Sequence, residues 1–229
     1  VPYVNVDHLD AHILAHFIDG DIPPLPFLCL LVSGGHTQIV QVDKNYQMTI
    51  LSKTLDDAAG EAFDKAGKML SLPYPSGHII DQKAKDGNPK AFAFNTPQVG
   101  ELDFSFSGLK TSILYFLQKE MRKDNQFIAE NINDLCASIQ HTIVSYLMKK
   151  LSAAMEQTGI NHIGIAGGVA ANSLLRDELQ KLAVKKEGVA YIPKFEYCTD
   201  NAAMIAFAGK IKLEQQKYGT LNDVCFTRR

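Results

Sequence analysis

A continuous apolar run, Phe27-Leu-Cys-Leu-Leu-Val32, constrains the fold of this chain most strongly, because it has the length of a single strand. The small turn Ser33-Gly34-Gly35 follows it, and residues 36–42 then alternate into a second strand. A third short strand, Met48–Leu51, comes after a polar turn. These segments predict a meander of three strands that opens a mixed sheet.

From Asp56 onward the apolar spacing becomes helical, and the acids Asp56 and Asp57 suit the first turn of a helix over residues 56–70. Two further strands are expected at His162–Ala166 and Val189–Ile192. Other helices are predicted over about residues 79–84, 108–123, 125–158 with a break near its start, 170–186, and 199–216. The alternation of strand and helix in the closing third predicts an α/β layered sheet.

Composition excludes several classes of protein. The 46% hydrophobic and 21% charged residues are typical of a soluble globular protein, and no apolar run approaches the roughly 20 residues that span a bilayer. With no signal-peptide pattern either, we expect a cytoplasmic location and no membrane partner. The cysteines are far apart and are interpreted as reduced packing residues: Cys29, Cys136, Cys198 and Cys225. A net charge of -2 means that nucleic-acid binding would need a local patch or a helper protein.

Two histidines, His8 and His12, stand four residues apart, the spacing that lets both imidazoles reach one metal ion from one helix face. Zinc and iron both suit imidazole. His16 continues the same face one turn later. Such a pair also occurs by chance on amphipathic helices, and Leu9 stands where a zinc peptidase would carry its general-base Glu.

Two glycine turns are candidates for holding an anion or nucleotide. Backbone N–H groups at Ser33-Gly34-Gly35 could approach an anionic oxygen, although an ordinary hairpin explains the glycines equally. Gly167-Gly168 closes a strand and opens a helix, so a nucleotide could lie over the helix N-terminus with Asn172 beside it. A tight turn with good helix packing is the alternative interpretation.

Two acids complete the candidate chemistry. Asp64, with Gly77 giving room beside it, is either an acceptor for ligand hydroxyls or a solvated carboxylate. Asp200 is either a helix cap or an oxygen ligand that completes His8 and His12.

Taken together and in this order, the motifs resemble the TsaD/Gcp family, the tRNA threonylcarbamoyladenosine transferases once described as O-sialoglycoprotein endopeptidases. The segments that carry the resemblance span nearly the whole chain: residues 8–12, 31–38, 57–67, 73–77, 103–111, 167–172 and 198–204. The resemblance implies a fold like that of actin, hexokinase and the heat-shock ATPases (ASKHA), with two α/β lobes and the ligand between them. It also implies transfer of a threonylcarbamoyl group from threonylcarbamoyl-AMP to the exocyclic amine of the adenosine 3′ of the anticodon, in tRNAs reading codons that begin with A.

Site residues follow from the matching motifs. The resemblance implies that His8, His12 and Asp200 bind one divalent metal ion, with Fe(II) expected over Zn(II). It implies that the adenylate is held by Leu31, Val32, Ser33, Gly34, Gly35, Asp64, Gly77 and Asn172. No side-chain nucleophile is expected, because AMP is already a good leaving group. Expected partners are tRNA, threonylcarbamoyl-AMP or ATP, a same-fold paralogue and, as in bacteria, a small P-loop ATPase.

The chain begins at Val1-Pro2, where family members carry much of a first lobe, so we expect a second lobe with a remnant of the first. Residues 1–26 would be that remnant with its histidine helix, residues 27–198 the second lobe with the glycine turns, and residues 199–229 a C-terminal helix packing back toward the first lobe. We expect this fragment alone to be inactive. The alternatives are a metalloendopeptidase, a non-catalytic nucleotide-binding scaffold of the ASKHA fold, and an ATPase or sugar kinase of that fold.

Overall fold

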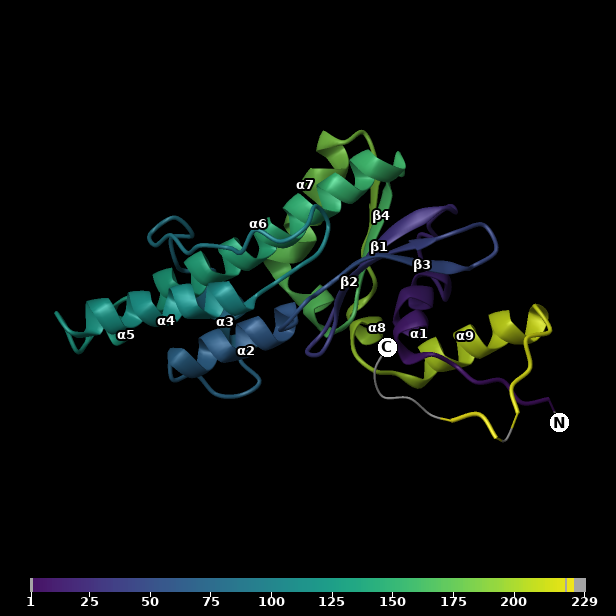
Figure 1. Ribbon diagram of the computed structural model, residues 1–229, viewed down its shortest axis with the longest axis horizontal. Helices are drawn as coiled ribbons and strands as arrows, with labels where there is room; N and C mark the ends of the chain where they lie inside the picture. The colour runs from purple at the N-terminus through teal and green to yellow at the C-terminus, as the bar shows by residue number, and fades with distance from the viewer. Residues whose placement is uncertain (1, 221, 225–229) are drawn as a thin grey trace.

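A five-stranded mixed sheet with strand order β3-β2-β1-β4-β5 forms the centre of the computed structural model, which describes residues 2–220 and 222–224 (Figure 1). The first three strands form the predicted antiparallel meander, and β4 and β5 add to it in parallel. Their bounds are β1 Phe27–Val32, β2 Thr37–Val42, β3 Met48–Lys53, β4 His162–Ala166 and β5 Val189–Tyr191. The prediction of a mixed sheet is confirmed.

The central strand β1 explains why the sheet supports helices on both faces. All six of its residues are fully buried, and successive side chains point to opposite faces of a strand. Leu28, Leu30 and Val32 enter one hydrophobic core. Phe27, Cys29 and Leu31 enter a second core on the other face. An uninterrupted apolar run is therefore what a strand between two helical layers requires.

Helices cover the sheet unequally (Figure 1). The larger core packs the sheet against α2 (Ala59–Met69), α3 (Gly77–Ala84), α4 (Ser107–Met121), α6 (Ile132–Thr158) and α7 (Ser173–Lys185). The smaller core packs it against α1 (His8–Leu14), the 3-10 turn η1 (Ala15–Phe17) and α9 (Ala202–Glu214). Short elements join these layers: α5 (Phe127–Glu130), the 3-10 turn η2 (Gly168–Ala171) and α8 (Phe195–Cys198).

Several helix starts differ from the predictions. The break expected early in residues 125–158 is real, since α5 ends before α6 begins. The helix predicted from residue 170 begins at Ser173, because η2 occupies the preceding turn. The helix predicted from residue 199 begins at Ala202, and its cap is Asn201, whose side chain accepts a hydrogen bond from the Met204 N–H. Asp200 is therefore not the cap of this helix.

The expected packing of the cysteines holds for three of them. Cys29, Cys136 and Cys198 are buried free thiols, and Cys225 lies outside the described residues. Within the described ranges, no helix has the length and apolar character needed to cross a membrane. The boundaries proposed after residues 26 and 198 stay predictions.

Candidate metal centre

Helix α1 presents the two histidines on one face. Its cap is Asp7, whose side chain accepts hydrogen bonds from the N–H groups of Leu9 and Asp10, so the helix begins at His8. His12 follows one turn later, and the rings of the two histidines meet edge to face with their centroids 4.9 Å apart. The predicted helical spacing of the pair is confirmed.

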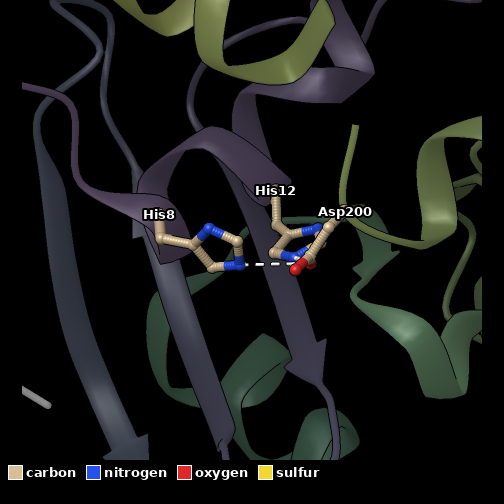
Figure 2. Close-up of side chains that lie close together, drawn as sticks. All are labelled: His8, His12 and Asp200. Atoms are coloured by element: carbon tan, nitrogen blue, oxygen red, sulfur yellow. Dashed lines mark hydrogen bonds and ion pairs between the residues drawn. The ribbon is translucent and has the colours of Figure 1, made fainter. Parts of the chain in front are cut away.

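Asp200 reaches this pair from the far end of the chain. It lies in the short segment between α8 and α9, and its Oδ1 atom is 3.2 Å from His8 Nε2 and 3.1 Å from His12 Nε2 (Figure 2). One potential ligand atom from each of the three residues lies within 4.8 Å of the other two. Two imidazoles and a carboxylate thus converge on one point, as a divalent cation requires.

The three side chains differ in burial. His12 is only 4% exposed, whereas the side chains of His8 and Asp200 are 52% and 78% exposed. Burial, followed by the nearby charge of His8, lowers the pKa of His12, and Asp200 opposes this shift. A lowered pKa favours the neutral imidazole, the form that can donate a lone pair to a metal.

The donor set fits Fe(II) or Zn(II), since both metals accept imidazole nitrogen and carboxylate oxygen. The second nitrogen of His12, Nδ1, is buried and has no hydrogen-bond partner among the described residues. A buried polar atom without a partner is uncommon. The ring is therefore held by packing and by its Nε2 contact, which leaves Nε2 as the atom that faces a ligand.

An open cavity of about 620 Å³ lies beside this centre, within the size range of small-molecule sites. Its lining comes from α1, the turn after β1, η2 and the segment before α9. The lining residues are His8, Leu9, His12, Ser33, Gly34, Gly35, His36, Gly168, Thr199 and Asp200.

The turn after β1 is shaped by Ser33, whose Oγ accepts a hydrogen bond from the His36 N–H at 3.0 Å. Gly34 and Gly35 face open space, because a Cβ atom added to either would meet nothing within 4 Å. The N-terminal end of α2 presses on the back of the turn, where the Gly60 N–H donates to Ser33 O at 3.1 Å. One side of the turn is therefore packed against α2, and the other side is open to the cavity.

Five predicted ligand residues do not line the cavity. Leu31 and Val32 are buried in β1. Asp64 accepts a hydrogen bond from the Ser76 N–H at 2.7 Å, next to Gly77 at the start of α3. Asn172 is buried, caps α7 through the Leu175 N–H and donates to Gln140 Oε1. The ligand roles of these residues stay predictions.

His16, the third histidine near α1, does not join His8 and His12 at the candidate metal centre. His16 is buried, and its Nε2 lies 2.9 Å from Ile165 O in β4. The interpretation that it continues the metal-binding face is wrong, because the chain tightens into η1 after Leu14 and turns the ring toward the sheet. In contrast, His36 lines the cavity although no role was predicted for it from the sequence, and Gly168 of the second predicted glycine turn lines it too.

Known proteins of one family are similar to this chain over most of its length. The family model of TsaD, tRNA N6-adenosine threonylcarbamoyltransferase, matches residues 1–207. The protein of that name from Riemerella anatipestifer is 54% identical over 99% of this chain and 67% of its own length. The one from Porphyromonas gingivalis is 47% identical over 100% of this chain and 68% of its own length. The protein of that name from Christiangramia forsetii is 51% identical over 91% of this chain and 62% of its own length.

Solved structures support the predicted fold class. Full-length HypF in its phosphate- and nucleotide-bound form matches with a TM-score of 0.67 and 12% identity, over 95% of this chain and 36% of that protein. An activator of 2-hydroxyisocaproyl-CoA dehydratase from Clostridium difficile, with bound ADPNP, matches with a TM-score of 0.50 and 14% identity, over 94% of this chain and 70% of that one. These neighbours are ASKHA-type proteins, so the ASKHA fold is confirmed.

The chain spans roughly two thirds of the length of the curated relatives it matches. On the evidence of the family model and these relatives, it belongs to the TsaD family of tRNA N6-adenosine threonylcarbamoyltransferases.

Proposed function

We propose that the intact protein transfers a threonylcarbamoyl group from threonylcarbamoyl-AMP to the exocyclic amine of the adenosine 3′ of the anticodon, in tRNAs that read codons beginning with A. The convergence of His8, His12 and Asp200 at the mouth of a nucleotide-sized cavity carries this proposal. Membership of the TsaD family supports the reaction and the tRNA substrate.

His8, His12 and Asp200 would hold one divalent metal ion, with Fe(II) proposed over Zn(II). When bound, the ion would supply Lewis acidity and a template for the phosphate or carbamoyl oxygens of the adenylate. The neutral state favoured for His12 and the exposed carboxylate of Asp200 suit this role, because one side of the centre opens into the cavity.

The glycine turn would receive the anionic part of the ligand. Gly34 and Gly35 have no side chains between their backbone and the cavity, so N–H groups can approach phosphate oxygens closely. We propose Leu31, Val32, Ser33, Gly34, Gly35, Asp64, Gly77 and Asn172 as the adenylate-holding residues. Asp64 and Asn172 already make hydrogen bonds, but carboxylate and amide oxygens accept more than one, so capacity for a ligand remains.

The chemistry itself needs no side-chain nucleophile. The adenosine amine attacks the carbamoyl carbon and forms a C–N bond, the bond from that carbon to the phosphate oxygen breaks to release AMP, and the proton of the amine passes to solvent water. Catalysis then comes mainly from holding the two reactants in line. The turn after β1 suits this task because one of its sides packs against α2 and the other opens into the cavity. A cytoplasmic location, a same-fold paralogue and a small P-loop ATPase belong to the same proposal.

The test is reconstitution of the modification with the intact protein, its adenylate-forming enzyme, tRNA and defined metals. We expect His8→Ala and Asp200→Ala to reduce transfer about hundredfold or more, because each removes one metal ligand. Asp177→Ala is the matched control, since Asp177 is an exposed acid on α7 away from the cavity lining.

Two outcomes would contradict the proposal. One is full transfer after chelation of every divalent metal. The other is equal loss of transfer in Asp200→Ala and Asp177→Ala, because the metal centre would then have no special part in the reaction. Cleavage of a glycoprotein by the metal-loaded protein would instead support the peptidase alternative.

A further inference from the structure

We propose that Arg176 is a positioning residue of the metal centre, acting as a brace that holds the segment carrying Asp200 against the glycine turn η2. The inference rests on the proposed metal site. The side chain of Arg176 bonds to Ala170, Pro193 and Cys198, and it neither touches a proposed metal ligand nor lines the cavity.

The first side of the brace is η2. Arg176 lies on the first turn of α7, and its Nε donates a hydrogen bond to Ala170 O at 2.8 Å. Ala170 is fully buried, and Gly168 two residues earlier lines the cavity. The preceding residue, Gly167, has φ +87°, and a Cβ there would lie 2.4 Å from Val32 O, so the turn is pressed tightly against the end of β1.

The second side is the segment that leads to Asp200. Arg176 Nη2 donates to Pro193 O at 3.0 Å and to Cys198 Sγ at 3.2 Å. The guanidinium also lies over the ring of Phe195, 4.0 Å from its centroid, although that ring is 66% exposed. One planar group therefore contacts three residues of the six-residue stretch 193–198, which ends two positions before the proposed metal ligand Asp200.

Arg176 matters here because the other side-chain contacts of the segment before Asp200, those of Lys194 and Tyr197 with Asp19, lie on the protein surface. The side chain of Asp200 is 78% exposed, and the neighbouring helix α8 has only four residues. Asn201 fixes the far side of the segment by capping α9. Arg176 fixes the near side through buried Cys198. With both sides fixed, the carboxylate loses less conformational freedom when it binds a metal, and affinity rises accordingly.

The geometry uses properties that only arginine has. The planar guanidinium donates in two directions and stacks on a ring at once, whereas a lysine ammonium is a point charge without a flat face. Arg176→Lys therefore keeps the charge and the aliphatic stem but cannot keep all the contacts. Arg122→Lys is a matched control, since Arg122 is exposed at the end of α4.

The experiment measures binding of Co²⁺ and Zn²⁺ to the purified intact protein by calorimetry, with the visible ligand-field spectrum of bound Co²⁺ as a second readout. We expect Arg176→Lys to weaken binding about tenfold and to change the Co²⁺ spectrum, as loss of an outer contact around a metal site does. Arg122→Lys should match the wild type.

A double-mutant cycle separates positioning from a general loosening of the fold. In an Asp200→Ala background, Arg176→Lys should cost almost no further metal affinity, because the ligand that it positions is gone. An equal loss with and without Asp200, or unchanged affinity and spectrum in a folded Arg176→Lys protein, would overturn the inference. If the wild type binds neither metal, the proposed metal centre fails instead.

A second variant keeps the test decisive if Arg176→Lys does not fold. Phe195→Leu removes the exposed ring and leaves the hydrogen bonds of Arg176 in place. We expect it to weaken metal binding about two- to fivefold, the usual worth of one exposed cation–π contact. Unchanged affinity in this variant would count against the brace.

Discussion

At Gly60, one added methyl group should displace the turn at Ser33 and Gly34 that lines the cavity. This glycine is the second residue of α2, and a Cβ atom there would lie 2.6 Å from Ser33 O and 2.9 Å from both the N and Cα atoms of Gly34. Ordinary van der Waals contact begins near 3.4 Å, so the shortest contact is too close by about 0.8 Å. Because the obstructing atoms belong to backbone, neither side can move without displacing α2 or the turn that lines the cavity.

The expected cost of Gly60→Ala follows from two opposing effects. Overpacking a close contact costs about 1–3 kcal/mol. Replacing glycine in a helix returns up to about 1 kcal/mol through lower backbone entropy in the unfolded chain. The net result is a free energy of unfolding lower by about 1–2 kcal/mol, equivalent to a melting temperature lower by about 2–8 °C for a chain of this length.

Urea unfolding followed by circular dichroism measures this change. Gly77→Ala is the matched control: Gly77 begins α3, and a Cβ atom there would meet nothing within 4 Å. The control should be as stable as the wild type or up to about 1 kcal/mol more stable. A gain in stability of Gly60→Ala like that of the control would refute the close packing of α2 against the turn at Ser33.

Two further predictions concern buried polar side chains. Burial lowers the pKa of His16 to about 4, and its hydrogen bond to Ile165 partly opposes this shift. As the pH falls, the imidazole is protonated in the unfolded chain near pH 6.5 but in the folded protein only near pH 4, so the free energy of unfolding should fall by about 3 kcal/mol between these values. His16→Gln should remove that part of the fall in urea titrations. An identical pH dependence in both proteins would refute this. Lys150 is buried and donates to the carbonyl oxygens of Val99, Gly100 and Glu101, so Lys150→Met should lower the midpoint of urea unfolding by an amount equivalent to about 1–3 kcal/mol, whereas Lys149→Met at the exposed neighbouring position should change it little. Equal effects of the two substitutions would contradict the role given to the ammonium group of Lys150.

Local patterns predicted the sheet and most helices. The apolar run of β1 and the alternation in β2 are properties of adjacent residues, so they are visible before folding. Asp56 shows where this fails. It suited the first turn of the helix over residues 56–70, but α2 begins at Ala59, and the Asp56 carboxylate instead accepts hydrogen bonds from Ser105, Phe106 and Ser107 at the start of α4. No local pattern carries a contact across some fifty residues.

For the site too, local spacing predicted some residues and missed those whose place depends on distant segments. The spacing of His8 and His12 predicted two imidazoles on one helix face, and the structure places them so. The same spacing suggested His16, which a change from α-helix to 3-10 geometry turned into the core. His36 and Arg176 became visible only with the structure, because their significance depends on which distant segments meet beside them.

The long separation within the metal centre has a consequence for synthesis of the protein on the ribosome. His12 and Asp200 are 188 residues apart. A growing chain exposes both imidazoles early, while the carboxylate emerges only after the sheet and its larger helical layer have been made. An ion bound at the proposed centre with all three ligands would therefore require a polypeptide translated past α8 and folded back on its own beginning.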